Sequence, residues 1–396
     1  MRANKRMWYS RLSSGVVMLG AILVVILAAA ANLQAEVLRS GTYGYRIDLP
    51  TGWYALDVSD PSRVGFTDPE NHAVFQIYSY PRSRFADISA VVEFMEDRHG
   101  LSGDAVRFQY ERRDAVLGDY RFVTAQAQAR GYFTFLEYDE YFFVAVAFTL
   151  EPQYARYHDF LVSAIDSFAP GPAAEIAPGP ISQFYYEHPG AMPVHVPLEV
   201  GGRTVYFATD PAEEDAAQVV VEREARILAQ YPFTNNRSDP WVEAWRRFFR
   251  MVYRDNYSRI APLAGDLYRV FRADGVERDG MPAAILSWLQ GFEYDRIATL
   301  SDLRAPISCL LTLSGDCDSL GLTYVILLHV LGFDAILMIS AEYSHALGAV
   351  DVAGPGARFE FEGTGYLVAE LTDTVDIGLI PREMADPAGW IGVKFR

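Results

Sequence analysis

Apolar residues occupy nearly every position from Leu320 to Leu331, and Gly332 follows them. A run of this length that is hydrophobic on almost all faces predicts a buried helix with a glycine C-cap. The sequence Gly-Asp-Cys-Asp-Ser comes directly before the run, so we expect Cys317 in the first turn of this helix. Free N–H groups and the positive end of the helix dipole favour a thiolate there, and a thiolate is a nucleophile.

The first half of the chain shows short alternations of apolar and polar residues, which predict strands joined by tight turns. A helix is expected over residues 88–99, capped by Asp87 and ended by Gly100, and another over about 152–168. We expect turns at Gly118-Asp119 and at Arg130-Gly131. The strands predicted from the alternation cover residues 43–49, 73–80, 115–117, 120–130, 132–138 and 140–150.

Prolines and glycines between Pro170 and Pro180 predict a linker, after which helices dominate. A hairpin is expected around Gly201-Gly202, with strands at 195–200 and 203–208. Beyond the cysteine helix, apolar runs predict three further strands. The expected helices are 211–230, 240–256, 261–272 and 282–291, and the late strands are 333–339, 345–350 and 366–372. Together these elements predict an α+β protein.

A cysteine nucleophile needs a base, and the late strands offer one. His329 lies twelve positions along the same helix, about 18 Å away at 1.5 Å per residue, so it is too distant to serve Cys317. His345 begins a strand that can return over the start of the helix. An acid beside the second ring nitrogen would fix the tautomer, and Glu370 on the next strand is expected there, with Asp351 as the alternative.

The order Gly-Asp-Cys-Asp at a helix start, His-Ala-x-x-x-Val on a strand and acid-x-Thr on the next strand resembles the transglutaminase-like, papain-like cysteine hydrolase superfamily. The resemblance covers roughly Trp288 to Thr372. It implies a helical lobe plus an antiparallel sheet, with Cys317 attacking a carbonyl, His345 as base and Glu370 as orienting acid. It further implies acyl transfer on a protein or peptide substrate, with peptidase-like amide hydrolysis favoured over crosslinking.

The segment Gly44-Tyr-Arg-Ile-Asp-Leu-Pro-Thr-Gly-Trp53 and the element order around it resemble the photosystem P-protein (PsbP) and Mog1-like group. That resemblance implies an α/β/α sandwich with an antiparallel sheet and a non-catalytic positioning role. The expected organisation is therefore a signal segment over 1–35, a PsbP/Mog1-like module over 41–168, a linker over 169–183 and a transglutaminase-like domain over 184–396.

Two other interpretations of Cys317 remain open, a buried structural cysteine of the core and one half of a disulfide. A disulfide with Cys309, the other cysteine of the chain, would abolish the nucleophile, although eight residues leading into a helix seldom set the geometry of a bridge. A non-catalytic envelope scaffold or binding protein with a degenerate domain is the alternative function. If the site is active, the Cys317 N–H is the natural oxyanion donor and Gln290 could offer a second, or simply pack at a helix end.

The composition and charge of the chain exclude some classes of function. A hydrophobic fraction of 51% with 21% charged residues is typical of a globular protein. Acids exceed bases, 51 to 34, for a formal charge of −17, and such a field repels nucleic acid, which we exclude as a partner. No zinc-type cysteine pair, His-Glu-x-x-His or calcium loop occurs in the sequence, so we expect neither a metal nor another cofactor.

The beginning of the chain has the pattern of a secretory signal. Basic residues precede an apolar run from Val16 to Ala31, and small residues follow at its end. We therefore expect export to the periplasm or cell surface, with membrane contact only through this segment if it is retained as an anchor.

Overall fold

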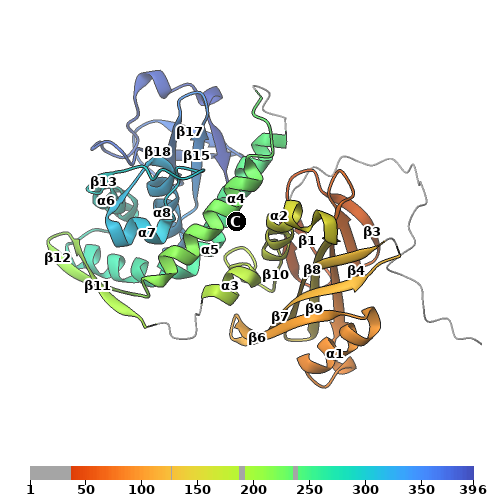
Figure 1. The fold of residues 1–396 in the computed structure, drawn as a ribbon. Helices are drawn as coiled ribbons and strands as arrows, with labels where there is room; N and C mark the ends of the chain where they lie inside the picture. Colours follow the sequence, from red (N-terminus) through yellow and green to blue (C-terminus); the bar gives the residue numbers. More distant parts are fainter. Residues whose placement is uncertain (1–36, 126, 187–191, 235–239) are drawn as a thin grey trace, which may run out of the picture.

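The computed structural model describes residues 37–125, 127–186, 192–234 and 240–396 of the chain. It shows an α+β protein with two domains, and the long helices α4 (Ala212–Leu228) and α5 (Pro240–Ala273) of the C-terminal domain lie on the side that faces the N-terminal domain (Figure 1). The predicted signal segment over 1–35 lies outside the described residues. Within them, no helix is both long and apolar enough to cross a membrane.

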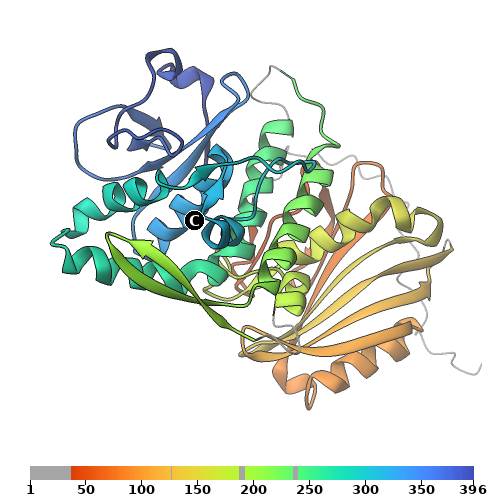
Figure 2. The same ribbon diagram turned by 60° about the vertical axis from the view of Figure 1, so that its left-hand side comes forward.

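The N-terminal domain is built on a seven-stranded antiparallel sheet in the order β3-β4-β5-β9-β8-β7-β6. One face packs on helix α1 through Val91 and Met95, and the other packs on helix α2 through Leu161 and Ile165 (Figure 2). The sandwich follows from the alternation along the strands, because successive side chains point to opposite faces. Its elements are β3 (Tyr54–Asp60), β4 (Arg63–Thr67), β5 (Ala73–Pro81), η1 (Arg82–Arg84), α1 (Ile88–His99), β6 (Ser102–Tyr110), β7 (Arg113–Val123), β8 (Gln128–Glu137), β9 (Tyr141–Leu150), η2 (Glu151–Gln153) and α2 (Tyr154–Ser167).

Two expected turns in this domain are wrong. Strand β7 continues through Gly118, and strand β8 continues through Gly131. A Cβ at Gly118 would lie 2.1 Å from the Tyr120 ring, and one at Gly131 would lie 2.1 Å from the Ala147 carbonyl oxygen. These glycines therefore permit close contact between neighbouring groups of the sheet and do not mark turns.

The segment predicted to be a linker is ordered and largely buried between the domains. Strand β10 (Ala169–Pro170) joins β2 (Tyr45–Ile47), which also pairs with β1 (Leu38–Arg39). The main chain that follows is fixed by hydrogen bonds from both domains, since the Pro178 carbonyl accepts from Tyr110 and the Ala177 carbonyl accepts from Arg254. Helix α3 (Pro180–Tyr186) then begins with its N–H groups on the buried carboxylate of Asp166.

The helical part of the C-terminal domain begins with the predicted hairpin, β11 (Val194–Val200) and β12 (Arg203–Thr209), followed by α4 (Ala212–Leu228). The two helices expected over 240–256 and 261–272 are one helix, α5 (Pro240–Ala273), which continues through Pro262. Residues on both sides of that proline, such as Ile260 and Leu263, are fully buried in the same core, and their burial offsets the lost hydrogen bond. The remaining helices are η3 (Arg278–Gly280), α6 (Met281–Leu289), α7 (Pro306–Thr312) and α8 (Cys317–Val330).

A five-stranded antiparallel sheet completes the domain, in the order β17-β18-β16-β15-β19. Helix α8 lies against β15 and β16 so closely that a Cβ on Gly348 would meet the ring of Tyr324 at 2.5 Å. Strands β13 (Glu293–Tyr294) and β14 (Ser314–Gly315) form a short parallel pair before α8. The sheet strands are β15 (Ala335–Ser340), β16 (His345–Val350), β17 (Arg358–Phe361), β18 (Thr364–Ala369) and β19 (Ile391–Val393), with η4 (Arg382–Met384) and η5 (Pro387–Gly389) before the last.

A buried ion network joins the two domains. Arg247 on α5 donates to the Glu224 carboxylate at 2.7 Å, to the Ser163 hydroxyl at 2.8 Å and to the Asp48 carbonyl at 2.7 Å. Arg250, one turn further, holds the Asp48 carboxylate through two hydrogen bonds. Although burial alone would raise the pKa of Asp48, the neighbouring arginines, Arg250 first, hold it well below its usual value. The network therefore fixes the domains through ionised groups.

Candidate active site

Cys317 is the first residue of α8, as predicted. The carboxylate of Asp316 caps the helix and accepts from the N–H and the hydroxyl of Ser319. Only 3% of Cys317 is exposed. The amide groups of the first turn have no carbonyl acceptor within the helix, so this end of α8 offers hydrogen-bond donors beside the sulfur.

His345 and Glu370 meet as the sequence order suggested. Nε2 of His345 lies 2.7 Å from Oε2 of Glu370. The other carboxylate oxygen of Glu370 accepts from the N–H of Thr372 at 2.8 Å and from its hydroxyl at 2.7 Å. Although burial would raise it, the pKa of Glu370 lies below its usual value because of these hydrogen bonds, His345 first. The arrangement leaves Nδ1 of His345 as the ring nitrogen that could exchange a proton with a substrate or a thiol.

The sulfur of Cys317 lies beside the start of β16, the strand that begins with His345. The ladder between β16 and β18 ends at the pair Gly348 and Ala369, and the backbone of Ala346 lies close enough to Cys317 to lower the pKa of its thiol slightly. The thiol itself points to Oδ1 of Asp318 at 3.7 Å. Among the described residues, no hydrogen bond joins the sulfur to the His345 ring. The structure thus brings cysteine and histidine to one place but directs the thiol proton toward a carboxylate.

The electrostatics of the cysteine differ from the expectation based on the helix dipole. Burial, followed by the carboxylates of Asp318 and Asp316, raises the pKa of the Cys317 thiol to about 12. Burial and Asp316 also raise the pKa of Asp318 to about 7. The expectation of a thiolate is therefore wrong, because burial and the two neighbouring carboxylates raise the pKa of the thiol by more than the helix N-terminus lowers it. The resting group is a thiol.

Gln290 and Asp351, the two auxiliary residues proposed from the sequence, do not lie where the proposed roles require them. The amide nitrogen of Gln290 donates to the carbonyls of Glu370 at 2.8 Å and Val375 at 2.9 Å, so both of its N–H groups are engaged. This geometry makes Gln290 a support for the Glu370 backbone instead of an oxyanion donor. Asp351 is exposed just past the far end of β16, roughly 20 Å along the strand from His345, and Glu370 occupies the orienting position.

An aromatic neighbour of the histidine could not be foreseen. The ring of Trp390 lies 6.3 Å from that of His345 at an interplanar angle of 63°, and its indole N–H donates to the Met384 carbonyl. Trp390 is 2% exposed and precedes β19, the strand that pairs with β15. Because 45 residues separate it from His345 in sequence, no local spacing reveals the contact.

The other cysteine is not bonded to the first. Cys309 and Cys317 are both free thiols and both buried. Cys309 packs against Gly315, where a Cβ would lie 2.9 Å from its sulfur, and burial raises its pKa to about 12. The structure therefore does not contain the disulfide that was the alternative for Cys317. Among the described side chains, no group of three or more His, Cys, Asp or Glu residues is arranged to hold a metal ion.

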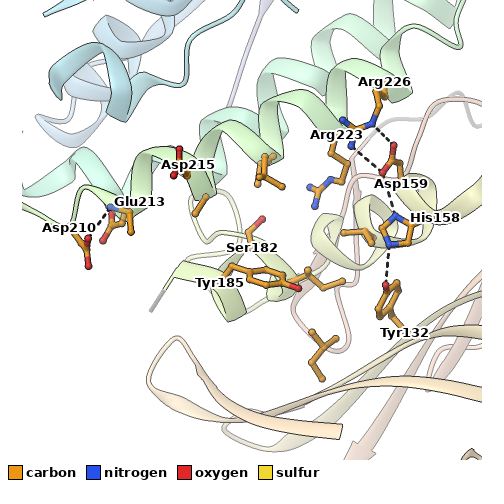
Figure 3. Close-up of a pocket in the computed structure, with 17 residues that line it drawn as sticks. Tyr132, His158, Asp159, Ser182, Tyr185, Asp210, Glu213, Asp215, Arg223 and Arg226 are labelled. Carbon is orange, nitrogen blue, oxygen red and sulfur yellow. Dashed lines mark hydrogen bonds and ion pairs between the residues drawn. The ribbon is translucent and has the colours of Figure 1, made fainter. Parts of the chain in front are cut away.

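A mostly apolar cavity of about 430 Å³ lies between the domains, away from these residues (Figure 3). One wall carries a chain of polar contacts from Tyr132 through His158 and Asp159 to Arg226. Acidic side chains of α4 and its N-terminal approach lie at the opposite end, as Figure 3 shows. None of Cys317, His345 and Glu370 lines this cavity, so it is separate from the candidate site.

Comparison with known proteins identifies no family for this chain and only distant structural neighbours. No family model matches the chain, and no curated protein matches it. Among solved structures, cyanobacterial PsbP (CyanoP) from Synechocystis sp. PCC 6803 is 14% identical, with 37% of this chain and 99% of that one covered and a TM-score of 0.30. A PsbP structure is thus among the neighbours, although a TM-score this low carries no argument.

Two further solved structures are similar at the same level. PA94 of Pseudomonas aeruginosa, of unknown function, is 17% identical, with 35% of this chain and 97% of that one covered and a TM-score of 0.24. A Bacteroides thetaiotaomicron protein is 10% identical over 84% of this chain and 89% of that one, with a TM-score of 0.26. None of the three is described as transglutaminase-like, so that resemblance stays a hypothesis.

Proposed function

We propose that this chain is an exported cysteine enzyme of the transglutaminase-like kind, which cleaves an amide bond in a protein or peptide by acyl transfer. Cys317 is the nucleophile, His345 the general base and Glu370 the orienting carboxylate. The observation that carries the proposal is the 2.7 Å contact between His345 Nε2 and Glu370, made beside a cysteine at a helix N-terminus. A carboxylate in this position fixes the tautomer of the ring and stabilises the imidazolium that forms during the reaction.

The protonated thiol determines the first step. The S–H group turns from Asp318 toward Nδ1 of His345 by rotation about the Cα–Cβ bond, and its proton passes to the ring as sulfur attacks the carbonyl. The resulting oxyanion would be stabilised by N–H groups at the start of α8. The amine leaves with the proton of the imidazolium, and a thioester remains on Cys317. Water then cleaves the thioester with His345 again acting as base, and the free thiol is restored.

The resting state of Cys317 favours a second candidate, the non-catalytic scaffold. Cys317 is buried, its pKa is raised to about 12, and its hydrogen-bond acceptor is Asp318. A thiol in that state without access to a base would be inert. The two functions differ in whether His345 controls the reactivity of the sulfur.

Alkylation of the full chain by iodoacetamide at pH 7, followed residue by residue with mass spectrometry, separates them. In the enzyme, Cys317 is alkylated at least about tenfold faster than the fully buried Cys309, which is the internal control. The variant His345→Ala slows that reaction by roughly 100-fold, the usual contribution of a positioned base, and Glu370→Gln slows it by about tenfold. Equal, slow alkylation of both cysteines that is unchanged in His345→Ala would establish the scaffold instead.

A further inference from the structure

A second cavity, of about 390 Å³, lies where the N-terminal strands, α5 and the end of the chain meet. It is unusual in a protein of formal charge −17, because basic side chains dominate its wall. They come from both domains and are Arg39, Arg46, Arg246, Arg250, Lys394 and Arg396. Such a concentration of one sign in a concave, partly buried surface creates a local potential opposite to that of the whole molecule.

The carboxylates at the cavity do not balance these charges. Glu175, Glu243 and Glu362 line the wall, and the buried Asp48 behind it pairs with Arg46 and Arg250. Six cationic side chains are therefore matched by three carboxylate side chains on the wall and one behind it. Among the described residues, no carboxylate pairs with Arg396, which donates only to the hydroxyls of two tyrosines on α5.

Arg46 shows the imbalance most directly. It is 2% exposed, and its Nη1 has no hydrogen-bond partner in the described part of the chain. It also stands directly opposite Arg39 in the β1–β2 ladder, an unfavourable placement of like charges that a single carboxylate, Glu175, bridges. A buried guanidinium with an unused donor is costly unless a further acceptor satisfies it, and an anion in the cavity would do so with the additional gain of opposite charge.

The position of the cavity suggests where an anion would come from. Val37 lines it, and the apolar run predicted as a signal or anchor ends at Ala31. Six extended residues span at most roughly 20 Å. A chain retained in the membrane by that run would therefore hold the cavity next to the layer of phospholipid headgroups.

We propose that this cavity binds a phosphate group, carried either by an anionic phospholipid or by free phosphate. Arginine forks match phosphate oxygens in pairs, and a lysine at the rim adds a point charge. The bound anion would contact side chains of both domains and so stabilise their junction. This binding is independent of the cysteine chemistry.

Thermal unfolding of the full chain at constant ionic strength tests the proposal with two ligands, sodium phosphate and dihexanoyl phosphatidic acid, and with chloride as reference. Both phosphates should raise the unfolding temperature saturably, and chloride should not. The ligand with the lower half-saturating concentration identifies the source, lipid headgroup or free phosphate. No response to either phosphate, or a response to chloride of the same size, overturns the proposal.

Matched variants locate the effect. Lys394→Gln with Arg396→Gln should weaken phosphate binding at least tenfold, whereas Arg203→Gln with Arg269→Gln removes the same charge from exposed positions outside the cavity and should leave it unchanged. Arg39→Gln, at a side chain 57% exposed, is a second cavity variant that does not depend on the end of the chain. Binding of wild-type strength in both cavity variants refutes the site.

Discussion

The pH dependence of stability in Asp318→Asn offers a quantitative test of the electrostatics around Cys317. Burial and Asp316 raise the pKa of Asp318 from 3.8 to about 7. Between these values the unfolded chain has released a proton that the folded chain keeps, so the stability of the wild-type protein falls as pH rises through this window. Above pH 7 the loss is complete. At 1.36 kcal/mol per pH unit, it amounts to at most roughly 4 kcal/mol.

Asparagine cannot ionise, so the variant avoids this loss while keeping an oxygen near the thiol. In urea unfolding of the full chain, the two proteins should be equally stable at about pH 4, and the variant should be more stable by roughly 1 to 4 kcal/mol at pH 8. Since Asp318 is also the foremost charge that raises the pKa of Cys317, alkylation of the thiol above pH 8 should be faster in the variant. Glu383→Gln, at an exposed side chain on η4, serves as the control. A difference that does not change with pH, or a variant less stable at pH 8, would refute the reasoning.

Two further predictions concern packing around the site and between the domains. Gln290→Ala leaves the Glu370 and Val375 carbonyls without their donors and should cost about 1–3 kcal/mol in urea unfolding. It should also slow Cys317 alkylation, and unchanged stability and rate would exclude the supporting role. Arg247→Met removes one of the two arginines that pair with the buried Glu224 carboxylate, so that Arg223 alone must serve both Glu224 and Asp166, and it should cost about 3–5 kcal/mol. Arg226→Met, at a half-exposed pair on the same interface, should cost less than about 1 kcal/mol. Equal costs in the two arginine variants would contradict this account.

Local signals in the sequence were sufficient for several elements. Helix α1 begins and ends where its cap residues predicted, with the Asp87 carboxylate on the Ala90 N–H and Gly100 at a φ of 59°. Helix α8 begins at Cys317 and strand β16 begins at His345, as the sequence predicted for these two elements. Such elements are decided by residues within a few positions of each other, which is the information that a sequence displays.

Long-range contacts account for what the sequence did not reveal. Strand β6 lies at the sheet edge and is exposed along most of its length, and its local signal is confined to the alternation of Val106, Phe108 and Tyr110 with polar residues. The rest of the strand is fixed by its pairing with β7. Helix α5 passes through Pro262 because burial on both sides of the proline outweighs its local cost. At the site, the contact of His345 with Glu370 followed from strand order, but the charge of the cysteine did not, because it depends on burial and on the direction of two neighbouring carboxylates.

The buried arginines between the domains determine how rigidly the N-terminal domain is held. Separating the domains would leave the buried Asp166 carboxylate without its partner Arg223 and would take Arg250 from Asp48, so the N-terminal domain is held in a fixed position against the C-terminal domain. A macromolecule bound to the N-terminal domain would therefore lie at a fixed distance and orientation relative to Cys317. Under the proposed function, this fixed distance would determine which amide bonds of a bound protein Cys317 can attack.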